Sequence, residues 1–213
     1  MMKWKFAQAL EIRWWKQYLS QKPVDQYLHD KKSYWRRVLK ECDLKSAQVQ
    51  GEVLDAGCGP AGIFTIFDQQ NVTAIDPLLE TYNKELSHFK KGWYPNVNFQ
   101  TLALEEMDFR EMFDYVFCLN AINHVHDIEL APDKLVAAAK KGSTLVLSID
   151  AHNYNMLKWL FRLIPGDVLH PHQYDLKEYR SMLSKRGCTI THEYLSKPGG
   201  IFNYVILVAR VSV

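Results

Sequence analysis

A glycine-rich run between two apolar segments carries the clearest chemistry of the chain. Residues 55–62 read DAGCGPAG, and the apolar segment 72–75 leads to a second carboxylate, Asp76. Gly57 and Gly59 allow positive φ and let a ligand approach the bare backbone. The two oxygens of Asp76 match the vicinal hydroxyls of a ribose. The pattern predicts a strand, a tight turn, a helix starting at residue 63 and a second strand, which together hold a nucleoside.

The glycines alone leave two classes of nucleoside open. The spacing Gly57-x-Gly59-x-x-Gly62 also fits a dinucleotide-binding fingerprint. Asp55 lies two residues before the first glycine, where a carboxylate can meet an ammonium group. S-adenosyl-L-methionine has such a cation and a nicotinamide cofactor does not. Asp55 therefore favours the sulfonium nucleoside, and a different Rossmann-like domain is the alternative.

Further motifs follow in a fixed order along the chain. The segments are 55–59 (DAGCG), 76–77 (DP), 113–118 (FDYVFC), 120–127 (NAINHVHD), 142–148 (GSTLVLS) and 160–183. Together they resemble the class I S-adenosylmethionine-dependent methyltransferases. Within that family they are most similar to the small-molecule branch that includes quinone-pathway enzymes.

The resemblance implies a fold and a cofactor. The fold is α/β, a Rossmann-like, doubly wound, seven-stranded and mostly parallel sheet with an antiparallel C-terminal hairpin strand. Residues 45–213 would form this domain, and residues 1–44 an N-terminal helical cap. The cofactor would be S-adenosyl-L-methionine, and the product S-adenosyl-L-homocysteine. The expected cofactor-binding residues are Asp55, Ala56, Gly57, Cys58, Gly59, Asp76, Pro77, Leu104, Glu105, Leu119 and Asn120.

The adenine end of the expected site departs from the family pattern. The family has an acidic residue soon after the third strand, predicted here over residues 97–102, and that position is Ala103. We therefore expect Leu104 to supply a backbone contact and Glu105 the carboxylate. The alternative for Glu105 is an acid at a helix N-terminus, stabilised by the helix dipole.

Histidines follow the predicted fourth and fifth strands, at the edge of the sheet where ligands bind in open α/β folds. His124 is the expected general base, because imidazole has an ordinary pKa of about 6.5. The alternative is a structural histidine bonded to backbone. His152, His172 and Tyr174 are expected to line the acceptor pocket. No carboxylate or cysteine lies at a recognisable ligand spacing from the histidines, so no metal site is expected.

Charge is uneven along the chain. Residues 1–40 hold ten Lys and Arg against three Asp and Glu, a local charge of +7, whereas the remainder holds 16 against 21. Trp4, Ala7, Trp14 and Tyr18 recur at helical spacing before Pro23, and a second helix is predicted over residues 24–42. These helices could cap the domain and close over the substrate. The alternatives are that they contact a membrane surface or that they bind nucleic acid.

The global numbers agree with one enzyme domain. A chain of 213 residues suits a single α/β domain, and its net charge of +2 makes nucleic acid an unlikely partner. Four scattered cysteines, and the lack of a signal-peptide or membrane-spanning pattern, predict a cytoplasmic protein. We therefore expect methyl transfer to an oxygen, nitrogen or carbon nucleophile of a small molecule, by in-line displacement. The alternatives are an RNA methyltransferase and a non-catalytic regulator that binds the same cofactor.

Overall fold

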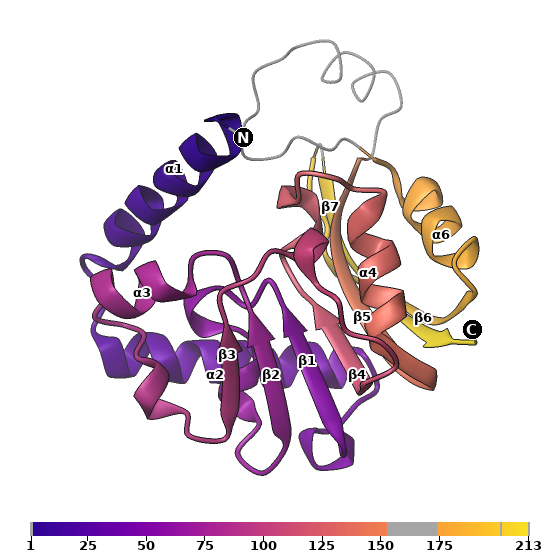
Figure 1. Cartoon of the computed structure of the whole chain (residues 1–213), viewed down its shortest axis with the longest axis horizontal. Helices are drawn as coiled ribbons and strands as arrows, with labels where there is room; N and C mark the ends of the chain where they lie inside the picture. Colours follow the sequence, from indigo (N-terminus) through magenta and orange to yellow (C-terminus); the bar gives the residue numbers. More distant parts are fainter. Residues whose placement is uncertain (1, 153–173, 201, 213) are drawn as a thin grey trace.

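A seven-stranded sheet forms the centre of the molecule (Figure 1). The computed structural model describes residues 2–152, 174–200 and 202–212. Within them the strand order is β3-β2-β1-β4-β5-β7-β6. The first five strands run parallel, and β7 runs antiparallel to both β5 and β6, so the predicted sheet is confirmed. The strands are β1 (Glu52–Ala56), β2 (Asn71–Ile75), β3 (Val97–Gln100), β4 (Phe113–Cys118), β5 (Ala139–His152), β6 (Cys188–Lys197) and β7 (Phe202–Val211).

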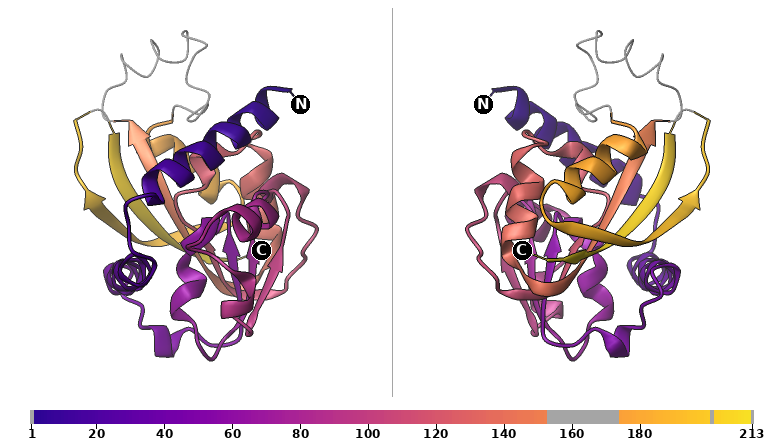
Figure 2. Two further views of the ribbon diagram at one scale, coloured as in Figure 1. Left: turned by 90° about the vertical axis from the view of Figure 1, so that its left-hand side faces the viewer. Right: turned by 90° about the vertical axis from the view of Figure 1, so that its right-hand side faces the viewer.

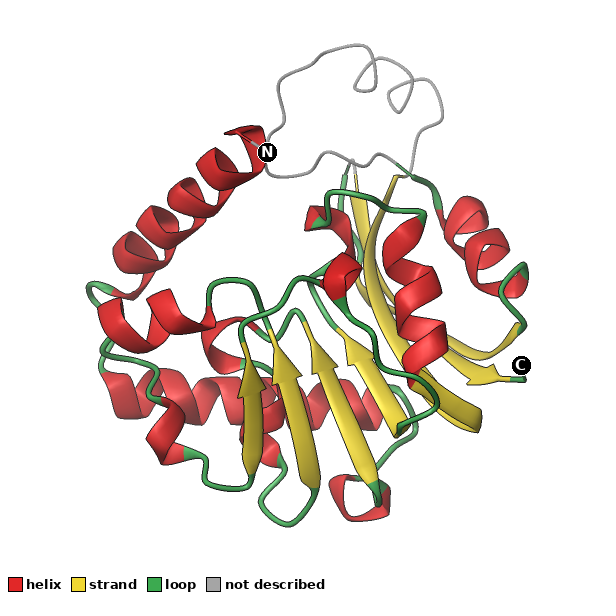
Figure 3. Cartoon of the chain, viewed as in Figure 1, coloured by secondary structure: helices red, strands yellow, loops and turns green. Residues whose placement is uncertain are grey.

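Helices cover both faces of the sheet (Figures 1 and 3). The described α-helices are α1 (Met2–Leu19), α2 (Val24–Glu41), α3 (Leu79–Glu85), α4 (Leu130–Ala138) and α6 (Leu176–Ser184). Short 3₁₀ segments lie at η1 (Ser46–Gln48), η2 (Gly59–Ala61), η3 (Ile63–Ile66), η4 (Lys91–Trp93), η5 (Leu104–Glu106) and η6 (Ile122–His124).

Successive residues of the central strands face opposite layers. Leu54 packs in one buried cluster with residues of α4 and α6, whereas Val53 packs in the other with residues of α2. Val116 and Phe117 of β4 divide in the same way. Both faces are therefore apolar, as expected for parallel strands with helices on either side. Burying one such side chain contributes about 1.5–3 kcal/mol.

The N-terminal helices take different places. Figure 2 shows α1 crossing above the carboxyl ends of the strands, while α2 lies along one face of the sheet. The indole N–H of Trp35 in α2 donates a buried hydrogen bond of 2.8 Å to the carbonyl of Ala61. Trp14 and Tyr18 are exposed, and Ile12, Trp15 and Leu19 pack on the core instead. The helical spacing of Trp14 and Tyr18 therefore does not mark the packed face of α1, because a neighbouring stripe of apolar residues packs on the core instead.

Several element ends differ from the predictions. The helix expected from residue 63 is the four-residue 3₁₀ segment η3, because the chain must re-enter the sheet at Asn71. The helix expected over residues 78–90 ends at Glu85, since the next residue is extended and Leu86 and Phe89 turn into the core. β3 ends two residues earlier than predicted, and β5 begins three residues earlier.

Candidate active site

The turn between β1 and β2, here called the glycine turn (residues 57–62), depends on glycine for two reasons. Gly57 and Gly59 have φ of +72° and +56°. The backbone N–H groups of Gly57 and Cys58 donate to the carbonyl of Ile75 at 2.8 and 3.0 Å. A Cβ on Gly57 would collide with the Cβ of Ala121, which follows β4. The turn is thus packed between the ends of β2 and β4, at the point where the strand order reverses.

Asp55 lies beneath this turn. Its side chain is 2% exposed, and Oδ2 accepts the N–H of Phe64 at 3.0 Å. A Cβ on Gly62 would collide with the same oxygen and with the carbonyl of Cys58. Burial raises the pKa of Asp55 to about 7, against the effect of its backbone hydrogen bonds. A cation brought to Asp55 would favour the ionised carboxylate.

Asp76 holds the opposite side of the glycine turn. Its Oδ2 accepts the N–H of Gly59 at 3.0 Å, and Oδ1 accepts the N–H of Leu78 at 2.8 Å. Burial raises the pKa of Asp76 to about 7, and the negative charge of Glu11 adds to this. Two buried carboxylates therefore flank one largely buried glycine turn, in which Gly57 and Gly59 are partly accessible, an arrangement suited to a polar ligand that carries a cation.

Helix α1 covers the glycine turn. Glu11 Oε1 accepts the Tyr82 hydroxyl at 2.7 Å and the Trp15 indole N–H at 3.3 Å. The Trp15 ring lies 3.9 Å from the position that a Cβ on Gly59 would take. The sequence pattern does not single out Glu11 or Trp15, because Glu11 contacts Tyr82, 71 residues away, and Trp15 lies against Gly59, 44 residues away. The aromatic content of the first helix is the one signal that points to them.

The carboxyl ends of β4 and β5 meet beside the turn. Asn120 has φ of +56°, a conformation that Asn tolerates, and its N–H donates to the buried Ser148 Oγ at 2.7 Å. Leu119 before it is buried. Asn120 and Asp150 open into a cavity of about 550 Å³ that Tyr34 and Tyr204 also line. Asn120, one of the expected cofactor-binding residues, thus lines a cavity.

The segment that carries His124 is fastened to β5 and α6. The amide of Asn123 donates to the Tyr179 hydroxyl at 3.0 Å and to the Asp150 carbonyl at 3.3 Å, and it accepts the Asp150 N–H. His124 itself is exposed. A rigid connection of this kind can hold an exposed base in a set position.

Glu105 bridges two loops. Its Oε1 accepts the N–H groups of His126 and Asp127 at 2.6 and 3.1 Å. The neighbouring Leu104 is buried, and its side chain approaches the glycine turn at Gly57. The adenine contacts of Leu104 and Glu105 stay predictions, since the observed hydrogen bonds of Glu105 tie protein segments together.

Two of the three residues expected to line the acceptor pocket, His152 and Tyr174, lie next to each other. The N–H of His152 donates to the carbonyl of Tyr174 at 3.0 Å. The His152 ring lies 4.3 Å from that of Phe202, and the Tyr174 ring 5.7 Å from that of Tyr179. The third expected residue, His172, lies outside the described residues.

The described residues contain neither a metal-binding cluster nor a membrane-spanning helix. Among residues 2–152, 174–200 and 202–212, no group of three His, Cys, Asp or Glu side chains could hold a metal ion. In the same ranges no helix has the length and apolar character needed to cross a membrane. The four cysteines are free and buried.

Residues 27–193 match a family model described as a methyltransferase domain. The chain belongs to this methyltransferase family. It is 30% identical over 125 residues to a ubiquinone biosynthesis O-methyltransferase of Bradyrhizobium, covering 52% of this chain and 48% of the relative. It is 32% identical over 99 residues to the enzyme of that name from Rickettsia conorii, covering 46% and 34%. The matches thus span half or less of these curated relatives.

Solved structures share the fold at low identity. A 1,6-didemethyltoxoflavin N1-methyltransferase of Burkholderia thailandensis, solved with its substrate and S-adenosylhomocysteine, aligns with a TM-score of 0.62 at 14% identity, covering 100% of this chain and 88% of that one. A magnesium protoporphyrin IX methyltransferase of Synechocystis, solved with S-adenosylhomocysteine, aligns with a TM-score of 0.57 at 20% identity, covering 87% and 84%. The family and the fold predicted from the motifs are confirmed.

Proposed function

We propose that this chain is an S-adenosyl-L-methionine-dependent methyltransferase that acts on an oxygen, nitrogen or carbon nucleophile of a small molecule. The observation that carries the proposal is the pair of buried carboxylates, Asp55 and Asp76, on either side of a glycine turn in a methyltransferase-family chain. Burial raises the pKa of both carboxyl groups, because neither ionised carboxylate is well solvated by the protein alone. An ammonium group and a ribose diol on one ligand would stabilise the two ionised carboxylates.

Each residue of the site has a proposed task. Asp55 would hold the ammonium group and Asp76 the ribose hydroxyls. Leu104 and Glu105 would face the adenine, and the positive-φ glycines let the cofactor lie against the backbone. The remaining cofactor contacts would come from Ala56, Cys58, Pro77, Leu119 and Asn120. The bound cofactor supplies a methyl group already activated on a sulfonium.

The remaining chemistry is orientation, exclusion of water and removal of a proton. Trp15 and α1 would shield the glycine turn, and the acceptor would lie at the carboxyl ends of β4 and β5. His124 would accept a proton from the acceptor when it carries one. The names of the curated relatives make an oxygen nucleophile the first acceptor atom to test.

Calorimetry with S-adenosyl-L-homocysteine tests the cofactor site. We expect the wild-type protein to bind it, and Gly57→Ala and Asp76→Ala to lose most of the affinity. Gly92→Ala is the control, since a Cβ there meets no atom within 4 Å. A wild-type protein that does not bind S-adenosyl-L-homocysteine would contradict the proposal.

Transfer of labelled methyl groups to a small-molecule extract separates an enzyme from a non-catalytic binder. His124→Ala should slow that transfer about a hundredfold if the imidazole is the base, with the acidic limb of the pH profile lost. An unchanged rate across pH would leave His124 structural. Gel shifts with tRNA over a salt series test the RNA alternative, and absent or salt-insensitive binding counts against it.

We further propose a cytoplasmic location, which the four free and buried thiols support.

A further inference from the structure

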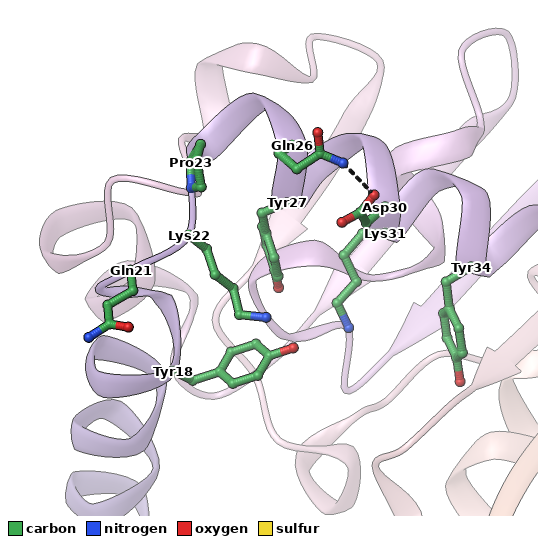
Figure 4. A pocket seen from close by; sticks show the side chains of 9 residues that line it. All are labelled: Tyr18, Gln21, Lys22, Pro23, Gln26, Tyr27, Asp30, Lys31 and Tyr34. Atoms are coloured by element: carbon green, nitrogen blue, oxygen red, sulfur yellow. Dashed lines mark hydrogen bonds between the residues drawn. The ribbon is translucent and has the colours of Figure 1, made fainter.

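A second cavity lies where α1 meets α2 (Figure 4). Its volume is about 330 Å³, and none of its lining residues belongs to the proposed cofactor site. Aromatic walls come from Tyr18, Tyr27 and Tyr34, and cations from Lys22 and Lys31. A cavity of this size suits a small molecule with a ring and an anionic group.

The two lysines lack acidic partners within the described part of the chain. Lys22 Nζ lies 4.1 Å from the centroid of the Tyr18 ring, and Lys31 Nζ lies 5.6 Å from that of Tyr34. Burial, and then the charge of Lys22, lower the pKa of Lys31. No carboxylate of the described residues forms a salt bridge with either lysine. Asp30 also lines the cavity, but its Oδ1 accepts the Gln26 amide at 2.8 Å.

The hydroxyl of Tyr27 adds an independent observation. Tyr27 is 4% exposed, and its buried hydroxyl has no hydrogen-bond partner among the described residues. Buried hydroxyls nearly always have a partner, because leaving one unpaired is unfavourable. Figure 4 shows this hydroxyl, the Tyr18 hydroxyl and the two ammonium groups directed toward one part of the cavity. Four donors thus converge there, and Asp30 is the one carboxylate among the described residues that line the cavity.

We propose that this cavity binds the carboxylate or phosphate of a small aromatic acid, and that it is the distal subsite for the methyl acceptor. An oxyanion there would bridge Lys22 and Lys31, remove their mutual repulsion and accept from Tyr27. The aromatic walls would hold the ring of the ligand.

Tyr34 forms part of the wall of two cavities, and its hydroxyl lies 3.4 Å from that of Tyr204. The same side chain lines the larger cavity that contains Asn120 and Asp150 at the carboxyl ends of β4 and β5. In the proposed arrangement, a ligand anchored at Lys31 would extend past Tyr34 toward those strand ends. The assignment to the acceptor rests on the proposed function, whereas binding of an anion does not.

A small ligand suits the cavity better than a macromolecule. The Tyr27 hydroxyl is buried, and a small anion can approach it with less rearrangement than a phosphate carried on an RNA backbone or on a lipid headgroup in a bilayer. Both macromolecules are nevertheless included in the test.

Benzoate and phenyl phosphate are the test ligands, and benzamide is the uncharged control. In calorimetry and thermal unfolding of the full chain, we expect at least one of the two anions to bind and raise Tm, and benzamide to do neither. Lys31→Gln should weaken that binding about tenfold. Lys32→Gln is the matched control, because it removes the same charge from the next residue of α2 and does not line the cavity.

Tyr27→Phe separates a binding role from a structural one. It removes the unpartnered hydroxyl and keeps the ring, so the Tm of the free protein should rise. The additional shift caused by the anion should shrink. A structural Tyr27 would show the first change without the second.

Equal anion affinity in wild-type, Lys31→Gln and Tyr27→Phe proteins would overturn the proposal, as would binding of RNA or anionic vesicles with no binding of either small anion. Binding of S-adenosyl-L-homocysteine is measured alongside. If the anion binds and S-adenosyl-L-homocysteine does not, the proposed function fails and the anion site stands. The reverse result removes the anion site alone.

Discussion

Gly62 illustrates a requirement set by space rather than by backbone conformation. Its φ of −72° is open to any residue, but Asp55 Oδ2 and the Cys58 carbonyl occupy the place of a Cβ. Gly62→Ala should therefore cost about 1–3 kcal/mol in the free energy of unfolding and weaken S-adenosyl-L-homocysteine binding. Urea unfolding and calorimetry measure the two effects. Gly92→Ala, placed in open space, should change neither, and equal midpoints for both variants would refute the prediction.

The buried carboxylates predict a pH dependence of stability. Asp55 and Asp76 have pKa values of about 7, raised by burial, against about 3.9 in an unfolded chain. Between these values the folded state holds protons that the unfolded state releases, so the free energy of unfolding falls as pH rises. We expect a loss of about 2 kcal/mol per carboxylate between pH 5 and pH 8. Urea unfolding at several pH values measures it.

Two variants check the sign of that dependence. Asp55→Asn should flatten the decline. Asp114 is the control with the opposite sign, because the Lys140 ammonium at 2.7 Å lowers its pKa. That contribution is present above the ordinary pKa and is lost as pH falls, so Asp114→Asn should cost stability mainly at neutral pH. The assignment would be contradicted if the wild-type protein were more stable at pH 8 than at pH 5 and Asp55→Asn showed the same difference in the free energy of unfolding.

Residue types could be predicted at these positions, but not their partners. The motif brings Asp55, Gly57 and Asp76 to one turn, as expected. It does not reveal that Asp76 binds the N–H of Gly59, or that Glu105 binds the backbone of His126. Both contacts join segments that only the sheet brings together, so no local pattern encodes them.

At the scale of the element, α1 is expected to act on the cofactor site through Trp15. Its ring lies over Gly59, and Glu11 fixes the indole N–H. Trp15→Ala should weaken S-adenosyl-L-homocysteine binding about three- to tenfold, since an aromatic contact and shielding from water are lost. Trp93→Ala removes an exposed tryptophan of η4 and should leave the affinity unchanged. Calorimetry compares them, and equal affinities would place α1 outside the site.

The hydrogen bonds of Asn123 predict a coupling between stability and catalysis. Asn123→Ala would leave the Asp150 backbone and the Tyr179 hydroxyl without this partner, and should cost about 1–3 kcal/mol. Methyl transfer should fall further than stability explains, because η6 carries His124. Asn98→Ala, at an exposed position of β3, is the control. Full activity of Asn123→Ala at a temperature where it is folded would remove the positioning role.

Strands could be predicted more securely than helix ends. Apolar runs such as residues 53–54 and 116–118 are buried on both faces and lie in strands as expected. Helix ends depend on where the chain must turn back into the core. Leu86 and Phe89 end α3 early in this way, and the inward face of α1 is decided by contact with Tyr82 rather than by periodicity.

At the scale of the molecule, α2 belongs to the core. Its buried side chains pack in the same cluster as Val53 of β1 and Phe64 of η3. They include those of Trp35, Val38 and Leu39. The family model also begins within α2, at residue 27. The predicted boundary between residues 44 and 45 stays a prediction, and the packing indicates that a cut there would open one face of the sheet.

Two truncations separate an appended cap from an integral layer. A protein lacking residues 1–22 keeps α2, so we expect cooperative unfolding and weakened S-adenosyl-L-homocysteine binding. A protein lacking residues 1–44 exposes Phe64 and its apolar neighbours to water, and we expect it to lose cooperative unfolding, since each buried aliphatic side chain contributes about 1.5–3 kcal/mol. Thermal unfolding followed by circular dichroism measures both. If residues 45–213 unfold cooperatively near the Tm of the full chain, α2 is a cap and the boundary at 44/45 is the true edge of the domain.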